Sequence, residues 1–322
     1  MSPKARIVFM GTPAFATASL RALYEAGHDI AGVVTVPDKP AGRGLHMQES
    51  DVKRYAREKG LLILQPEKLK NPDFIQQLSD LKADMFVVVA FRKLPSELWR
   101  IPPKGTFNLH ASLLPRFRGA APIQHAVISG ETVSGVTTFL IDEQIDTGNI
   151  ILRKEEPIYP GDTAGSLHDR LMVLGASTVV QTADLLMSGK AEIKSQHIFL
   201  NEGEKLPEAP KIHRAFCRLD ANEPAETLER KIRGLNPFPG AWLVLDDGTQ
   251  EKKEIKVFSA EVVSENGRSV GDVVTDGKNF WGFQTANNIL LVNELQSPGK
   301  KKLGIKDWLK GVRSEFSDWR VL

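Results

Sequence analysis

The stretch Met85-Phe86-Val87-Val88-Val89-Ala90 is the clearest buried strand in the chain, and the fold follows from the segments on either side of it. A continuous apolar run rich in β-branched residues is typical of a strand that is covered on both faces of a parallel sheet. Upstream, shorter apolar runs at residues 6–10 and 30–36 alternate with helical periodicity at residues 15–26, 53–59 and 73–81. Downstream, the same pattern predicts strands at 106–110 and 134–140 and a long helix at 163–186. This alternation favours right-handed crossovers and an α/β domain with a mostly parallel sheet.

The character of the sequence changes near Ser188. The following residues up to Pro210 are polar, contain Gly203 and Pro207, and have no sustained period, which predicts a linker. One more helix is expected at residues 225–235. Five short β-like runs then follow at residues 242–245, 254–263, 272–275, 280–285 and 289–295. Short strands separated by Asp-Gly and Asn-Gly turns indicate a small barrel or sandwich.

Composition places the chain among ordinary globular proteins and excludes several classes. Its 322 residues are 41% hydrophobic and 25% charged, which suits two domains better than one. A single cysteine, Cys217, excludes an internal disulfide and any CxxC pair. No apolar segment approaches the roughly 18 residues of a membrane span, so we expect a cytoplasmic protein without a membrane partner. A formal charge of +2 neither requires nor forbids a nucleic-acid partner.

Several well-known catalytic motifs are missing from the sequence. There is no GxxxxGK[ST] loop, no complete GxGxxG fingerprint, no HExxH and no GxSxG. The seven histidines include no pair at metal-ligand spacing, so no metal is expected.

The segment from Gly105 to Asp146 contains most of the candidate catalytic side chains. Strand alternation puts Asn108 and His110 on one face, with Cα atoms about 7 Å apart, at the carboxyl end where open parallel sheets bind ligands. An amide donor, an imidazole and the carboxylate of Asp146 fit attack of an amine on a carbonyl without a covalent enzyme intermediate. Taken alone, Asn-x-His is also typical of a polar pair at a sheet end, and Asp146 of a turn residue.

In combination, three segments resemble the folate-dependent formyltransferases. They are Asn108-Leu109-His110-Ala111-Ser112-Leu113-Leu114-Pro115, Arg118-Gly119-Ala120-Ala121-Pro122-Ile123-Gln124 and Asp146-Thr147-Gly148. The resemblance implies that Asn108, His110 and Asp146 are catalytic. It also implies that Ser112, Leu113, Leu114 and Pro115 contact the donor 10-formyltetrahydrofolate.

The resemblance extends to the domain organisation. It implies a Rossmann-like catalytic domain over residues 1–189, a linker over 190–210 and an OB-like β-barrel over 211–322. After Ala90 the chain departs from the family pattern, with Phe91-Arg92-Lys93 where Tyr-Gly is usual.

The acceptor is indicated by two further segments. Gly11-Thr12-Pro13 and Pro37-Asp38-Lys39-Pro40-Ala41-Gly42-Arg43-Gly44 are similar to the branch of the family that formylates methionine carried by initiator tRNA. In that branch the second segment reaches the acceptor end of the tRNA, which implies a tRNA contact for Arg43. Basic residues near the linker (Lys205, Lys211 and Arg214) would extend a phosphate track, and we expect a monomer.

Two other hypotheses remain open at this stage. The acceptor amine could belong to a sugar nucleotide or to glycinamide ribonucleotide, although the Arg43 segment and the basic barrel argue against this. Alternatively, the chain could be a non-catalytic RNA-binding protein on a formyltransferase scaffold, against which the presence of Asn108, His110 and Asp146 speaks.

Overall fold

The chain forms two compact units. The computed structural model describes residues 4–41, 46–200, 203, 205–248, 252–265, 267–312, 316 and 319–322. The first unit comprises Met1–Gly119, Val133–Pro157 and Asp169–Glu208. The second comprises Ala120–Thr132, Ile158–His168 and Ala209–Leu322. Two short segments that precede residue 190 thus group with the second unit.

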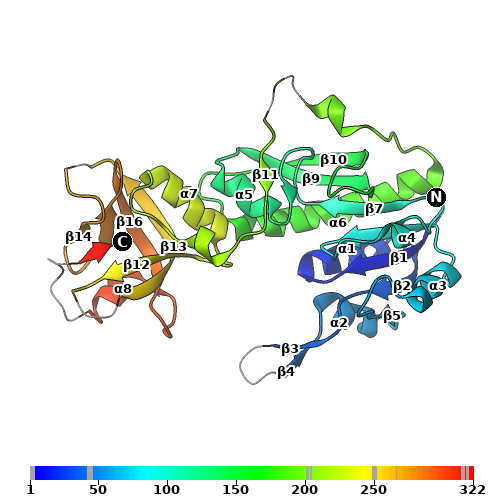
Figure 1. The fold of residues 1–322 in the computed structure, drawn as a ribbon, viewed down its shortest axis with the longest axis horizontal. Coiled ribbons are helices and arrows are strands. Elements are labelled where there is room, and N and C mark those ends of the chain that lie inside the picture. Colours follow the sequence, from blue (N-terminus) through cyan, green and yellow to red (C-terminus); the bar gives the residue numbers. More distant parts are fainter. Residues whose placement is uncertain are drawn as a thin grey trace. The chain divides into compact units, whose positions relative to one another are not determined.

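A seven-stranded sheet organises the first unit, in the order β10-β9-β7-β6-β1-β2-β5 (Figure 1). Its strands are β1 (Arg6–Gly11), β2 (Asp29–Val34), β5 (Ile63–Leu64), β6 (Met85–Val89), β7 (Thr106–His110), β9 (Val133–Leu140) and β10 (Ile150–Pro157). From β5 to β7 every neighbouring pair is parallel, while β9 and β10 are antiparallel additions. The expected Rossmann-like, mostly parallel sheet is confirmed.

Two helices of the first unit begin at side-chain caps. The helices of this unit are α1 (Ala14–Glu25), α2 (Asp51–Glu58), α3 (Pro72–Asp80), α4 (Ser96–Trp99) and most of α6 (Ala164–Ser188). Ser50 accepts the Lys53 backbone N–H at the start of α2, and Asn71 accepts that of Asp73 at the start of α3. Such side-chain acceptors satisfy donors that the first helical turn leaves unpaired.

The expectation that no segment approaches the apolar length of a membrane span was wrong. Helix α6 is the one helix among the described residues that is long and apolar enough to cross a membrane, by length and composition alone. Its buried Thr182 hydroxyl hydrogen-bonds Thr138 of β9 at 2.8 Å. At Gly175 a Cβ would lie 2.8 Å from Leu109 of β7. The helix therefore packs on the sheet, and this contact accounts for the apolar residues on its buried face.

The second unit is an antiparallel barrel with helices. Its helical elements are α5 (Pro122–Ile128), η2 (Arg214–Cys217), α7 (Ala225–Leu235) and α8 (Ile305–Leu309). Its strands are β12 (Ala241–Asp246), β13 (Lys253–Val263), β14 (Val273–Thr275), β15 (Trp281–Gln284), β16 (Ile289–Gln296), β17 (Leu303–Gly304) and β18 (Arg320–Val321). The strand order is β14-β15-β16-β13-β12-β18. A bridge between Asp272 and Arg320 brings the two ends together, so the sheet is a nearly closed, OB-like barrel, as expected.

Several elements were not predicted from the sequence. They are the hairpin of β3 (Lys39–Ala41) and β4 (His46–Gln48), the pair of β8 (Arg118–Gly119) and β11 (Glu208–Ala209), strands β10, β17 and β18, helices α4, α5 and α8, and the 3-10 turns η1 (Gln196–Phe199) and η2. Strand β10 lies at the sheet edge and carries Arg153-Lys154-Glu155-Glu156, so its charges mask the apolar signal. The other elements are too short for a period to be visible.

Candidate active site

Strand β7 presents the two predicted polar residues at the carboxyl end of the sheet. Leu109 packs against Gly175 of α6, so its neighbours Asn108 and His110 point to the opposite face. The adjacent parallel strand β6 ends at Val89, level with Leu109. The sheet thus places an amide and an imidazole where open α/β sheets bind their ligands.

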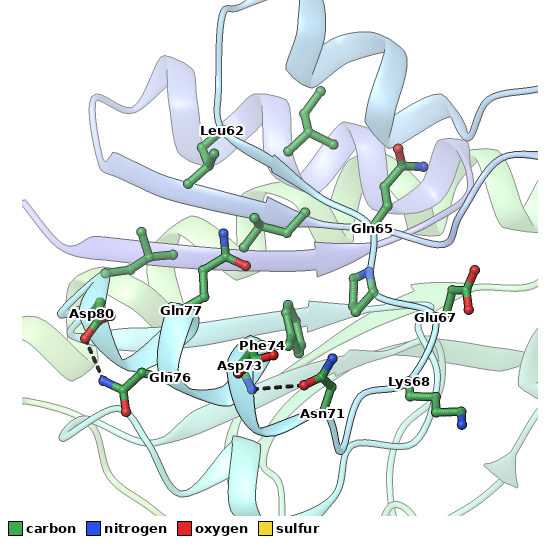
Figure 2. A pocket seen from close by; sticks show the side chains of 14 residues that line it. Leu62, Gln65, Glu67, Lys68, Asn71, Asp73, Phe74, Gln76, Gln77 and Asp80 are labelled. Atoms are coloured by element: carbon green, nitrogen blue, oxygen red, sulfur yellow. Dashed lines mark hydrogen bonds between the residues drawn. The ribbon is translucent and has the colours of Figure 1, made fainter.

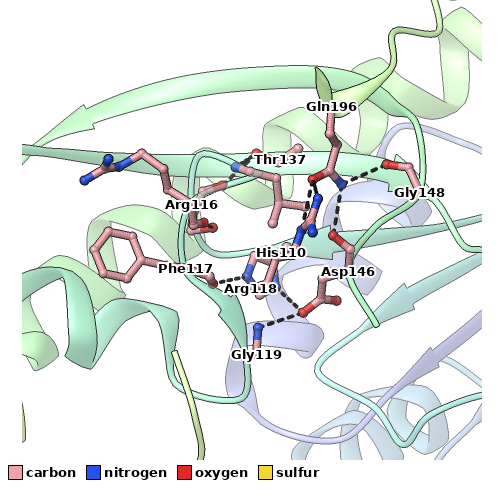
Figure 3. Close-up of polar contacts among 11 residues, drawn as sticks. His110, Arg116, Phe117, Arg118, Gly119, Thr137, Asp146, Gly148 and Gln196 are labelled. Atoms are coloured by element: carbon pink, nitrogen blue, oxygen red, sulfur yellow. Dashed lines mark hydrogen bonds and ion pairs between the residues drawn. The ribbon is translucent and has the colours of Figure 1, made fainter. Parts of the chain in front are cut away.

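The structure brings His110 and Asp146 together (Figure 3). The Nδ1 atom of His110 lies 3.7 Å from Oδ2 of Asp146, and both side chains are largely buried. The Nε2 atom lies 2.9 Å from the carbonyl oxygen of Phe117. Because a carbonyl only accepts, Nε2 carries a proton and donates it. The neutral ring therefore keeps its lone pair on Nδ1, on the side of the carboxylate.

The loop between β9 and β10 holds Asp146 in a constrained backbone. Its φ angle is 56°, in the left-handed region that non-glycine residues rarely adopt. The carboxylate accepts the Gly119 N–H through Oδ2 at 3.0 Å. At Gly148 a Cβ would lie 1.7 Å from the Leu140 carbonyl oxygen, so only glycine fits there. The Asp146-Thr147-Gly148 sequence thus allows the loop conformation that keeps the carboxylate beside His110.

Asn108 is half-buried, and its amide has no hydrogen-bond partner among the described residues. Its strand neighbours are Val88 of β6 and Phe139 of β9, paired through the backbone. An amide that makes no internal hydrogen bond and is partly accessible can donate to a ligand oxygen.

The loop Ser112 to Pro115, for which the resemblance implies a donor contact, is mostly buried. Ser112, Leu114 and Pro115 are buried, and the Ser112 hydroxyl donates to the Arg116 carbonyl at 2.7 Å. The Leu114 N–H donates to the Thr137 hydroxyl at 3.1 Å. Leu113 keeps partial exposure. The loop can therefore offer a ligand its backbone and Leu113, while the other side chains hold its shape.

Two residues at the site were missed by the sequence interpretation, Gln196 and its partner Arg118. The Gln196 side chain is 3% exposed and accepts from Arg118 through Nε at 3.1 Å and Nη2 at 2.5 Å. Its amide nitrogen donates to the carbonyl oxygens of Asp146 and Gly148, each at 2.9 Å. Gln196 comes from the segment predicted as a linker. No motif marks it, because its partners are mostly backbone groups.

The predicted tRNA contacts are spread over both units. Arg43 lies outside the described residues. The hairpin that leads to it is anchored by Asp38, and hydrogen bonds from Lys53 and then Gln65 hold the pKa of this carboxyl below its usual value. Lys205 and Lys211 are exposed. Arg214 pairs with Glu254 and lies 5.3 Å from the Trp242 ring centroid.

A cavity of about 1100 Å³ lies elsewhere on the first unit, beside β5 and α3. Figure 2 shows Gln65, Phe74 and Gln77 among its lining side chains. None of the predicted site residues lines it. In the described part of the chain, no group of three or more His, Cys, Asp or Glu side chains could hold a metal ion.

Two family models match the chain, one for each of its two predicted domains. Residues 5–183 match the formyl transferase family, and residues 211–313 match the formyl transferase C-terminal domain. The chain belongs to the formyl transferase family, and the resemblance drawn from the sequence is confirmed.

Particular relatives are similar over nearly the whole chain. The "Methionyl-tRNA formyltransferase" of Parabacteroides distasonis is 46% identical over 312 residues, which is 96% of either chain. The protein of that name from Bacteroides thetaiotaomicron is 47% identical over 309 residues, again 96% of either chain. That of Flavobacterium johnsoniae is 42% identical over 98% of either chain.

Solved structures share the fold at low identity. WlaRD, described as a sugar 3N-formyl transferase with dTDP and 5-N-formyl-THF, has a TM-score of 0.63 and 18% identity over 93% of this chain and all of its own. HypX from Aquifex aeolicus in complex with tetrahydrofolic acid has a TM-score of 0.62 and 20% identity, over 97% of this chain and 49% of its own. Both show a shared architecture.

Proposed function

We propose that this protein transfers the formyl group of 10-formyltetrahydrofolate to the free amino group of methionine carried by initiator tRNA. The observation that carries the proposal is the pairing of His110 with Asp146 at 3.7 Å, beside Asn108 at the carboxyl end of the sheet. Relatives named for this reaction, at 46% identity over 96% of the chain, support the choice of acceptor.

The proposed chemistry uses the chain's own groups. The amine lone pair attacks the formyl carbon, and the carbonyl electrons move to oxygen, where the Asn108 amide donates a hydrogen bond. His110 accepts, at its Nδ1 atom, the proton shed by the amine, and Asp146 stabilises the resulting imidazolium. The carbonyl then re-forms as the bond from the formyl carbon to N10 breaks, its electron pair goes to N10, and His110 gives its proton to N10. No metal ion takes part in this scheme.

Substrate binding is divided between the two units in this proposal. Ser112, Leu113, Leu114 and Pro115 form the donor-contacting loop, acting through the backbone and Leu113. Arg43, Lys205, Lys211 and Arg214 contact the tRNA, with Lys205 and Lys211 exposed as such a role requires. We retain residues 1–189 as catalytic domain, 190–210 as linker and 211–322 as tRNA-binding domain, in a cytoplasmic monomer.

The test offers the purified protein and 10-formyltetrahydrofolate three acceptors: methionyl initiator tRNA, a sugar-nucleotide amine and glycinamide ribonucleotide. We expect formyl transfer to the tRNA, weakening as salt rises. Activity on a small amine alone would overturn the proposal, and no transfer to any acceptor would favour a binding protein. Arg43→Ala should reduce discrimination among tRNA acceptors without changing donor binding.

A further inference from the structure

The side chain of Gln196 joins two loops of the candidate active site. Its amide nitrogen donates to the Asp146 and Gly148 carbonyls, and its oxygen accepts from the Arg118 guanidinium (Figure 3). The orientation of the amide is fixed by chemistry, because carbonyls only accept and a guanidinium only donates. With the side chain 3% exposed, water cannot easily replace these four bonds.

The stretch of chain that contains Gln196, from Lys194 to Pro207, also reaches His110 through Phe117. The Phe117 N–H donates to the Pro207 carbonyl at 2.7 Å, and the Phe117 carbonyl accepts from His110 Nε2 at 2.9 Å. Phe117 has a φ of 58°, a strained value that persists only when its contacts impose it. The Gln196 side chain thus holds Asp146, which faces Nδ1 of His110. The Pro207 carbonyl holds Phe117, which binds Nε2.

The stretch is anchored independently of these bonds. The N–H of Lys194 donates to the Ile150 carbonyl at 2.8 Å, and the Ile150 N–H donates to the Lys194 carbonyl at 2.7 Å. Phe199 packs on a buried cluster that includes Leu114 and Phe139, and its ring lies 4.3 Å from the Arg153 guanidinium. A substitution at Gln196 should therefore release the Asp146 loop without detaching the stretch.

We propose that Gln196 is a positioning residue for formyl transfer, which sets the distance between Asp146 and His110 from within the segment that leads to the barrel. The inference rests on the proposed function for its reaction. In this proposal Gln196 touches neither substrate nor the reacting atoms; it acts through Asp146, whose backbone carbonyl it binds while the Asp146 carboxylate faces His110.

The decisive variant is Gln196→Glu. A carboxylate of nearly the same shape keeps the Arg118 interaction as an ion pair, but it cannot donate to the Asp146 and Gly148 carbonyls. We expect kcat to fall about 10- to 100-fold, the range typical when an orienting hydrogen bond is removed, with little change in KM for either substrate. An unchanged kcat would overturn the proposal, and so would an effect confined to KM.

Two further variants separate positioning from stability. Phe199→Leu weakens the anchoring of the same stretch but leaves the Gln196 bonds, so it should lower the melting temperature and spare kcat. Gln196→Met removes all four bonds and serves if the glutamate variant fails to fold. If kcat in the variants falls only in proportion to the melting temperature, including in Phe199→Leu, the role is structural and the proposal fails.

A double-mutant cycle tests whether Gln196 acts through Asp146. In an Asp146→Asn background, Gln196→Glu should lower kcat little further. If the effects of the two substitutions on the activation free energy add fully, Gln196 does not act through Asp146. The wild-type rate with methionyl-tRNA tests the proposed function by itself. If another amine is the acceptor, the ratio of the variant's kcat to the wild-type kcat is measured with that amine. The positioning role of Gln196 can then be tested even if the proposed acceptor is wrong.

Discussion

Asp146 faces Nδ1 of His110 at 3.7 Å, while Nε2 of the same ring donates to the carbonyl of Phe117. The ring is thus oriented at Nε2, and Nδ1 is the nitrogen that faces the carboxylate. A neutral imidazole held in this way can accept a proton only at Nδ1. The structure therefore shows which nitrogen of His110 faces Asp146, and the sequence alone does not reveal this.

Replacing Asp146 with asparagine should remove the charge that stabilises the imidazolium. We expect Asp146→Asn to lower the single-turnover rate of formyl transfer by about 10²- to 10⁴-fold, as for other proton-transfer groups. Asp142→Asn is the matched control, because Asp142 lies in the same loop and accepts from Thr147 and Gln144. Equal reductions in the two variants would point to loop folding instead of charge.

The Asn108 amide is expected to act on the oxyanion. Asn108→Ala should reduce kcat by about 10²- to 10³-fold, the usual cost of one oxyanion donor, and leave donor affinity nearly unchanged. Fluorescence titration with the folate and steady-state kinetics measure the two effects. Asn222→Ala, at an exposed position of the second unit, is the control. A variant that loses donor binding but keeps its rate would assign Asn108 to the folate instead.

Gly148 has no room for a side chain. In Gly148→Ala the new Cβ would meet the Leu140 carbonyl oxygen at 1.7 Å, so the loop carrying Asp146 must shift. We expect a destabilisation of about 1–3 kcal/mol in urea unfolding, as for other overpacked sites, together with a reduced kcat. Gly311→Ala, whose Cβ would meet no atom closer than the Trp308 carbonyl oxygen at 3.4 Å, should change neither quantity. A Gly148→Ala protein of normal stability would contradict the packing argument.

Stability should depend on pH through His28. Burial lowers the pKa of this imidazole, against a smaller opposing effect of Asp184, and Nδ1 accepts the Ala5 N–H. The folded state then binds fewer protons than the unfolded chain, whose histidine pKa is about 6.5. Stability from this group is complete above that pH and falls as the pH drops towards the folded pKa.

The measurement is the unfolding free energy in urea at several pH values between about 5 and 8, a window that spans the unfolded histidine pKa. His28→Asn keeps an acceptor for Ala5 and should flatten the slope relative to the wild type. Other histidines contribute equally to both proteins, so identical slopes would exclude His28 as the source.

Salt dependence can identify the individual cations that bind phosphate. Removing one such cation should reduce the slope of log K against log salt by about 0.7 to 0.9. Lys211→Ala should show such a reduction in tRNA binding, while Lys104→Ala, an exposed lysine of the first unit, should not. An unchanged slope for Lys211→Ala would remove that residue from the tRNA-binding set.

Most of the framework could be predicted from local patterns. Apolar runs predicted β1, β6 and β7, and alternation placed Asn108 and His110 on one face of the sheet. Five of the barrel strands, β12 to β16, were also found, because turn residues separate them clearly. Strand β10 was not, since an edge strand with solvated charges has no apolar period.

The interactions that orient the site could not be read from the sequence. Gln196 bonds to peptide carbonyls 50 and 48 positions away, and any residue type supplies a carbonyl. The resemblance implied a donor contact for Ser112 but not the direction of its hydroxyl, which donates to the Arg116 carbonyl. Such choices depend on which backbone groups the fold leaves unpaired, and that is settled only when distant segments meet.

The position of Gln196 and Pro207 limits how the chain can be divided. A fragment that ends at residue 189, where strand–helix alternation stops, would lack both the side chain that holds the Asp146 loop and the carbonyl that holds Phe117. A fragment meant to keep the chemistry should therefore include the catalytic domain, residues 1–189, together with the linker as far as residue 208. Chimeras that exchange the barrel should keep their junction beyond residue 208 if the acceptor is to change while the chemistry is retained.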